Sequence, residues 1–149
     1  LGEAVPGSDV LELYAGPGVL SAEILSRGAA HLIAVERSPR IAAAWGRNMD
    51  RVGFEDEADI MVTTARRAVA DLIAKGRVFS LIFADPPYGL QESADLWRDT
   101  QWPALLAPEG RLVIEQGAKD PLPAPAGLVC TWERKTGDTM IYMFQRGPE

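Results

Sequence analysis

Short apolar runs alternate with amphipathic stretches along most of the chain, and this alternation predicts parallel strands separated by helices. The first apolar run covers residues 9–14, and a helix-like stretch over residues 19–27 follows it and ends at Gly28, as expected for a C-terminal cap. Further strands are predicted at 31–35, 58–62, 78–84 and 111–116, and further helices at 39–52, 65–75 and 96–106.

The end of the chain departs from this alternation. Two strands, at 128–134 and 139–146, follow each other without a helix, and residues 135–138 join them in a turn. A tight turn between adjacent strands indicates a hairpin, so we expect the final strand to run antiparallel. The pattern predicts one α/β domain over residues 1–149, with a doubly wound, Rossmann-like, mostly parallel seven-stranded sheet.

A proline-rich segment, Asp85-Pro86-Pro87-Tyr88, directly follows the predicted strand at 78–84. Two consecutive prolines fix two φ angles and remove two N–H donors, so the loop presents only acceptors. Asp85 and the Pro86 carbonyl can each accept one N–H of a planar amino group, and Tyr88 can stack on a base. Asp and Pro are also common in ordinary strand-ending turns, so the motif alone leaves both interpretations open.

A glycine turn, Ala-Gly-Pro-Gly at residues 15–18, separates the first strand from the first helix. Such a turn brings the backbone close to a ligand at a helix N-terminus. A dinucleotide site would need a third glycine at position 21, where the chain has Ser21. Glu12 instead completes an acidic-x-x-x-Gly-x-Gly pattern used for S-adenosylmethionine. Glu36 ends the second strand, where a carboxylate grips ribose hydroxyls or is simply solvated.

The candidate ligand-binding residues follow the first four predicted strands, and their carboxyl ends form the edge where ligands bind in such sheets. The candidate cofactor contacts are Glu12, Tyr14, Gly16, Gly18, Glu36, Arg37, Thr64, Ala65 and Asp85. The candidate catalytic residues are Asp85, Pro86 and Tyr88, and the candidate substrate contacts are Pro87, Tyr88, Arg66 and Arg67.

Composition constrains the choice of partner. A chain of 149 residues, 47% of them hydrophobic, can form one domain with a core, but a net charge of −6 is not typical of a general nucleic-acid binder. Local basic clusters can still contact RNA, although each is equally compatible with a solvated surface pair. These clusters are Arg66-Arg67, Lys75-Gly76-Arg77 and Arg134-Lys135.

The cysteine and histidine content argues against a disulfide framework and against metal catalysis. Cys130 is the only cysteine and lies in the apolar stretch 128–132, so we expect a buried structural thiol in a reducing, cytoplasmic compartment. His31 is the only histidine, and we expect it to be structural. No apolar run has the length of a membrane span.

These motifs together resemble the RsmD family of class I S-adenosylmethionine-dependent methyltransferases. The resemblance is carried by residues 11–18 (LELYAGPG), 23–29 (EILSRGA), Val35-Glu36, the Asp85–Tyr88 segment and the late Gly137-Asp138-Thr139. It implies that Gly16, Gly18 and Glu36 hold S-adenosylmethionine and that the loop from Asp85 holds a guanine. The implied activity is methylation of the 2-amino group of a guanine in 16S ribosomal RNA, on naked RNA or on an assembly intermediate, by a monomer that uses no metal.

Three departures from the family pattern affect these expectations. Pro17 replaces the usual Ser or Thr and removes an N–H from the glycine turn. Thr64 stands where an acid often contacts the adenine. The basic N-terminal segment with its Arg-Pro-Thr run is missing, so we expect this chain to be a fragment.

Two other functional classes remain open from the residues alone. An adenine amino-methyltransferase acting on DNA or RNA uses the same acceptor loop, although no target-recognition insertion is evident in 149 residues. A non-catalytic nucleotide-binding or RNA-assembly module would keep the fold, but it would not need Asp85 and Tyr88.

Overall fold

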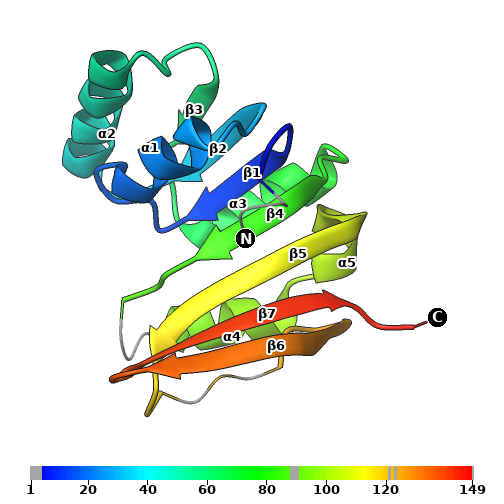
Figure 1. Ribbon diagram of the computed structural model, residues 1–149. Helices are drawn as coiled ribbons and strands as arrows, with labels where there is room; N and C mark the ends of the chain where they lie inside the picture. The colour runs from blue at the N-terminus through cyan, green and yellow to red at the C-terminus, as the bar shows by residue number, and fades with distance from the viewer. Residues whose placement is uncertain (1–4, 88–90, 121, 123, 149) are drawn as a thin grey trace.

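A seven-stranded sheet in the order β3-β2-β1-β4-β5-β7-β6 forms the centre of the computed structural model, which describes residues 5–87, 91–120, 122 and 124–148 (Figure 1). The first five strands are parallel, whereas β7 runs antiparallel to both β5 and β6, which confirms the predicted mixed sheet. The strands are β1 (Asp9–Leu13), β2 (His31–Val35), β3 (Ala58–Met61), β4 (Phe79–Ala84), β5 (Leu106–Gly117), β6 (Leu128–Thr136) and β7 (Thr139–Arg146).

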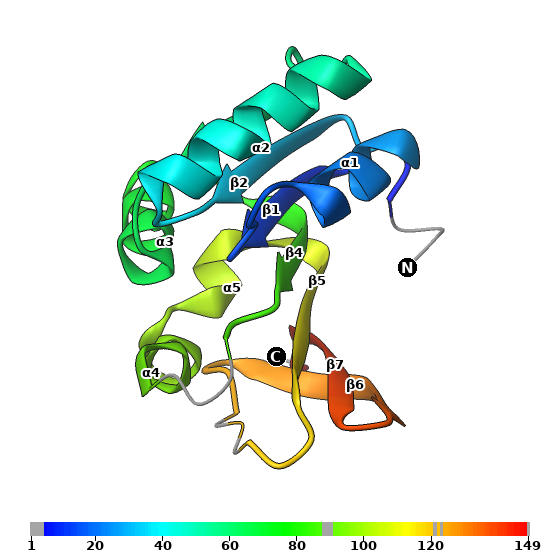
Figure 2. The same cartoon turned by 90° about the vertical axis from the view of Figure 1, so that its left-hand side faces the viewer.

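Helices lie on both faces of the sheet. Figure 2 shows α1 (Val19–Ser26) and α2 (Pro39–Val52) on one face, and α3 (Ala65–Ala74), α4 (Gln91–Asp99) and α5 (Trp102–Leu105) on the other. Each face buries its own hydrophobic cluster. The sheet is therefore covered in the doubly wound manner that parallel strands need, since their two faces are both apolar.

Local sequence signals explain where the helices of the site begin. Ser38 caps α2, because its hydroxyl accepts a hydrogen bond from the backbone N–H of Ile41 at 3.3 Å, and Pro39 occupies the first helical position. Thr64 caps α3 in the same way, with its hydroxyl 3.2 Å from the N–H of Arg67. Both caps fix the direction in which the chain leaves the carboxyl end of a strand.

The predicted helix at 96–106 is wrong in detail, because two helices cover this region. α4 ends at Asp99, and α5 starts at Trp102 with Pro103 in its first turn, where a missing N–H costs no helical hydrogen bond. Residues 107–110, between the predicted helix and the predicted strand, lie inside β5. The pairing of β5 with β4 shifts register at this point, and this irregularity accommodates the extra residues of β5.

The expectation of a buried Cys130 is also wrong, since this thiol is exposed. It lies on β6, at the edge of the sheet, where every residue after Leu128 is exposed. The apolar stretch at 128–132 therefore marks an edge strand rather than a core strand. Among the described residues, no helix is long and apolar enough to cross a membrane.

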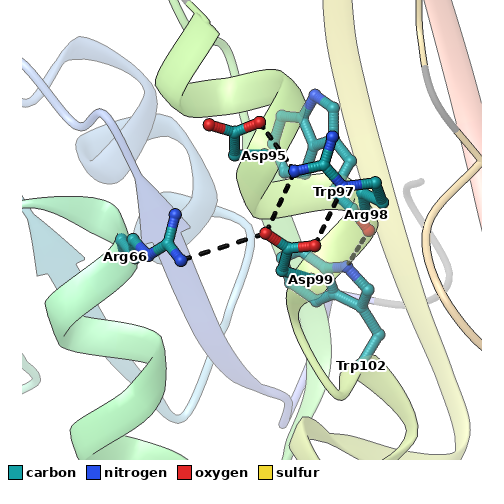
Figure 3. Close-up of polar contacts among 6 residues, drawn as sticks. All are labelled: Arg66, Asp95, Trp97, Arg98, Asp99 and Trp102. Carbon is teal, nitrogen blue, oxygen red and sulfur yellow. Dashed lines mark hydrogen bonds and ion pairs between the residues drawn. The ribbon is translucent and has the colours of Figure 1, made fainter.

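Two tryptophans attach α4 and α5 to the sheet. Trp97 and Trp102 are fully buried, their ring centroids lie 5.7 Å apart, and the Trp102 indole N–H donates to the Trp97 carbonyl at 3.1 Å (Figure 3). This packing positions α4 and α5 against the sheet.

The substitution Trp97→Ala should lower the free energy of unfolding by about 3–5 kcal/mol, because it removes a large buried ring. Trp132 is 45% exposed, so Trp132→Ala should cost only about 0.5 kcal/mol and serves as the matched control. Urea denaturation of both variants measures the difference. Equal losses would contradict the assigned packing of α4.

Candidate active site

A cavity of about 440 Å³ opens at the carboxyl ends of β1 to β4. It combines a carboxylate pair, Glu36 and Asp85, with an apolar wall, and its volume is that of a small-molecule site. The lining residues are Tyr14, Val35, Glu36, Arg37, Ser38, Ile41, Thr63, Ala65, Asp85 and Pro87. The predicted meeting of strand ends at one rim is thus present in the structure.

Glu36 joins the turns that follow β1 and β2. One carboxylate oxygen accepts the backbone N–H of Gly16 at 3.1 Å, and the other accepts the N–H of Ser38 at 2.8 Å. Only 9% of Glu36 is exposed. A carboxylate offers about four lone-pair positions, so these two bonds leave room for hydroxyl donors from a ligand.

The glycine turn packs directly against α2. Gly18 has φ 100°, and a Cβ at this position would lie 2.8 Å from Met49 Cε and 2.9 Å from Trp45 Cδ1. Asn48 Nδ2 donates to the Pro17 carbonyl at 2.7 Å. Only glycine therefore fits at position 18, and α2 holds the turn at Pro17, which has no N–H to donate.

Glu12 points into the protein and is absent from the cavity lining. Its carboxyl accepts a short hydrogen bond from the Ser21 hydroxyl, which in turn accepts the Trp45 indole N–H at 2.9 Å. Glu12 is 3% exposed, and burial raises its pKa to about 7, although the hydrogen bond from Ser21 opposes this shift. The acid of the glycine pattern thus links β1, α1 and α2 beneath the turn.

The acceptor loop leaves the end of β4 at the mouth of the cavity. Asp85 and Pro87 line the cavity and are exposed, whereas Pro86 is buried. Desolvation raises the pKa of Asp85, and the nearby charge of Glu115 raises it further. Tyr88 lies outside the described residues.

The remaining predicted contacts divide into two groups. Tyr14, Arg37 and Ala65 line the cavity, whereas Thr64 does not, because its hydroxyl caps α3. Arg66 and Arg67 are exposed on the first turn of α3. Figure 3 shows Arg66 facing Asp99 of α4, with 3.9 Å between Nη2 and Oδ2.

Four lining residues, among them Val35 at the end of β2, were not predicted from the sequence as ligand contacts. Thr63 directly precedes Thr64, the N-cap of α3, and Ser38 and Ile41 lie at the cap and first turn of α2. Ile41 could have been predicted from the sequence, because it is an apolar residue in the first turn of a helix that begins shortly after Glu36. An apolar residue in that position can cover a ligand held by the carboxylate. Within the described part of the chain, no group of His, Cys, Asp and Glu is arranged to hold a metal ion.

The fold and this rim define a class I methyltransferase domain. The chain is 27% identical to a conserved hypothetical protein of Streptococcus pyogenes, with a TM-score of 0.80 over 95% of this chain and 88% of that chain. TrmN from Thermus thermophilus, at 22% identity, shares the fold with a TM-score of 0.79 over 97% of this chain and 46% of its own.

The chain belongs to the RsmD family, since the family model described as Conserved hypothetical protein 95 matches residues 1–145. It is 27% identical over 98% of its length to Ribosomal RNA small subunit methyltransferase D of Escherichia coli (strain K12), of which it covers 72%. It is 29% identical over 98% of its length to YlbH of Bacillus subtilis (strain 168), provisionally named an rRNA methyltransferase, of which it covers 80%.

Glu12 should make stability depend on pH. Its folded-state pKa is raised, so the folded protein is favoured below pH 4.5 and loses that advantage as the pH rises through about 7. Relative to wild type, Glu12→Gln should therefore be more stable by roughly 2–3 kcal/mol at pH 8 than it is at pH 5. Denaturant unfolding at both pH values measures this difference, and a constant offset would contradict the raised pKa.

Proposed function

We propose that this protein transfers a methyl group from S-adenosylmethionine to the 2-amino group of a guanine in small-subunit ribosomal RNA. The proposal is supported by one observation: the cavity that Glu36 lines also contains Asp85 and Pro87 of the acceptor loop, at the same edge of the sheet. The cavity suits a nucleoside-containing cofactor, and the loop suits an amine. The two halves meet at Asp85, which belongs to both.

The residues of the cavity fit S-adenosylmethionine. Glu36 retains lone pairs for the two ribose hydroxyls, and the apolar side chains of Val35 and Ile41 can cover the adenine. The N-terminus of α1 has no side-chain cap, so its first N–H groups can receive the carboxylate of the methionine portion. When bound, this cofactor would supply an electrophilic methyl group on a sulfonium.

The acceptor loop can raise the reactivity of a weakly nucleophilic base amine. Asp85 and the Pro86 carbonyl each accept one N–H, which aligns the nitrogen with the methyl carbon. If a bound cofactor gave up its methyl group to the amine, with a C–N bond formed and the C–S bond broken, the Asp85 carboxylate would stabilise the positive charge on the nitrogen. The surplus N–H proton would then pass to solvent.

The choice of ribosomal RNA rests on the named activity of the relatives. Arg66 and Arg67 are exposed on the first turn of α3, directly after the cavity residue Ala65, and are the described cations that we assign to contact the RNA backbone. The net charge of −6 limits general nucleic-acid affinity, which favours a structured target such as an assembly intermediate of the small subunit. The base must leave its stack to reach the rim.

The cofactor assignment predicts that Glu36→Ala raises the dissociation constant for S-adenosylmethionine by roughly 10–100-fold, as expected when hydrogen bonds to a charged group are lost. Glu23→Ala, which removes an exposed acid of α1, is the matched control and should leave it unchanged. Isothermal titration calorimetry measures both constants. An unchanged value for Glu36→Ala would refute ribose binding.

The acceptor assignment predicts a different result for Asp85→Ala. Methyl transfer should fall at least about 100-fold, because one stabilising partner of the transition state is lost. The dissociation constant for S-adenosylmethionine should change little. Asp71→Ala, at an exposed position of α3, controls for loss of a surface charge. Parallel losses of transfer and cofactor affinity would contradict the assigned role.

A further inference from the structure

Glu115 lies beside Asp85 at the carboxyl edge of the sheet. β4 and β5 are parallel neighbours, and their register pairs Phe83 with Val113 and Ala84 with Ile114. Continuing this register by one residue places Asp85 and Glu115 at adjacent strand ends. The carboxyl end of β5 therefore adds a second acidic residue to the region that receives the target amine.

Strand alternation, continued one residue past the end of β4, assigns both carboxylates to the same side of the sheet. Ala84 and Ile114 are buried in the cluster beneath α3, α4 and α5, and Phe83 and Val113 are buried in the opposite cluster. Glu115 therefore lies on the face of Phe83 and Val113, and the same alternation assigns Asp85 to that face. The pairing of Glu115 with Ile141 of β7, which packs against that same cluster, agrees with this direction.

The two acidic groups interact electrostatically. The charge of Glu115 is one of the causes that raise the pKa of Asp85. Glu115 is half-buried, and its side chain makes no ion pair or hydrogen bond within the described part of the chain. Two like charges held side by side disfavour the folded state, and such local conflicts are typical of functional positions.

The hydrogen-bonding edge of guanine matches a pair of acceptors. Guanine presents two adjacent donors, the N1–H and the 2-amino group, whereas adenine presents an amino group beside an N1 lone pair. An ionised carboxylate only accepts hydrogen bonds, so it attracts N1–H and repels the N1 lone pair. A site that accepts a hydrogen bond from one base strongly rejects an analogue that lacks the donor.

We infer that Glu115 determines base specificity: its carboxylate accepts the N1–H of the target guanine while Asp85 and Pro86 hold the 2-amino group. The inference rests on the proposed function, and it supplies the guanine preference that the acceptor loop lacks by itself. Adenine placed in the same orientation would point its N1 lone pair at Glu115.

The inference can be tested on a synthetic RNA in which the mapped target guanine is replaced by 2,6-diaminopurine. This base keeps the 2-amino group, but its N1 is an acceptor. Wild-type protein should prefer guanine by at least about 100-fold in kcat/KM. The preference should fall below about tenfold in Glu115→Gln, whose amide can donate to N1, and also in Glu115→Ala.

Two measurements separate the possible outcomes. Calorimetry with S-adenosylmethionine verifies that each variant folds, and Glu109→Gln, at an exposed position of the same strand, should keep the full preference. If the Glu115 variants retain the wild-type preference, the specificity role is overturned while the proposed function stands. If wild-type protein methylates no guanine in small-subunit RNA, the proposed function and the inference built on it both fail.

Discussion

The rest of the site depends on one buried carboxylate that ties two strand-end turns together. Glu36 accepts backbone N–H groups from Gly16 and from Ser38, so the turn after β1 and the start of α2 cannot separate without breaking charge-assisted hydrogen bonds. Because α2 in turn contacts Gly18 and binds the Pro17 carbonyl through Asn48, the glycine turn is fixed from two sides. These contacts together fix the position of the turn and of the start of α2 at the cavity.

The contacts from α2 also hold the proline of the glycine turn in place. Pro17 donates no N–H, but its carbonyl accepts a hydrogen bond from the Asn48 amide of α2. The Trp45 indole of α2 donates to Ser21 of α1, just after the turn. Beneath the turn, Glu12 and Ser21 connect the same helix to β1. The acid of the glycine pattern is therefore part of the framework, and Glu36 is the carboxylate of the two that lines the cavity.

The features that could be predicted from the sequence are those that local chemistry determines. The caps of α2 and α3, the antiparallel hairpin and the gathering of strand ends follow from residue type and spacing. The prediction for Cys130 was wrong because tertiary context decides its burial: it lies in an apolar stretch of sequence, but that stretch is an edge strand. Thr64 caps α3, and its predicted contact with the cofactor stays a prediction. Glu115 became visible only through the register of β4 and β5.

We propose that the protein transfers a methyl group to a base amine at this rim. The most direct test of this proposal is to incubate the protein with labelled S-adenosylmethionine and unmethylated small ribosomal subunits, and then to digest the RNA and identify the labelled nucleoside. The labelled product should be N2-methylguanosine at a single position in the RNA. Label in adenosine, or no transfer to RNA by protein that binds the cofactor, would contradict the proposal.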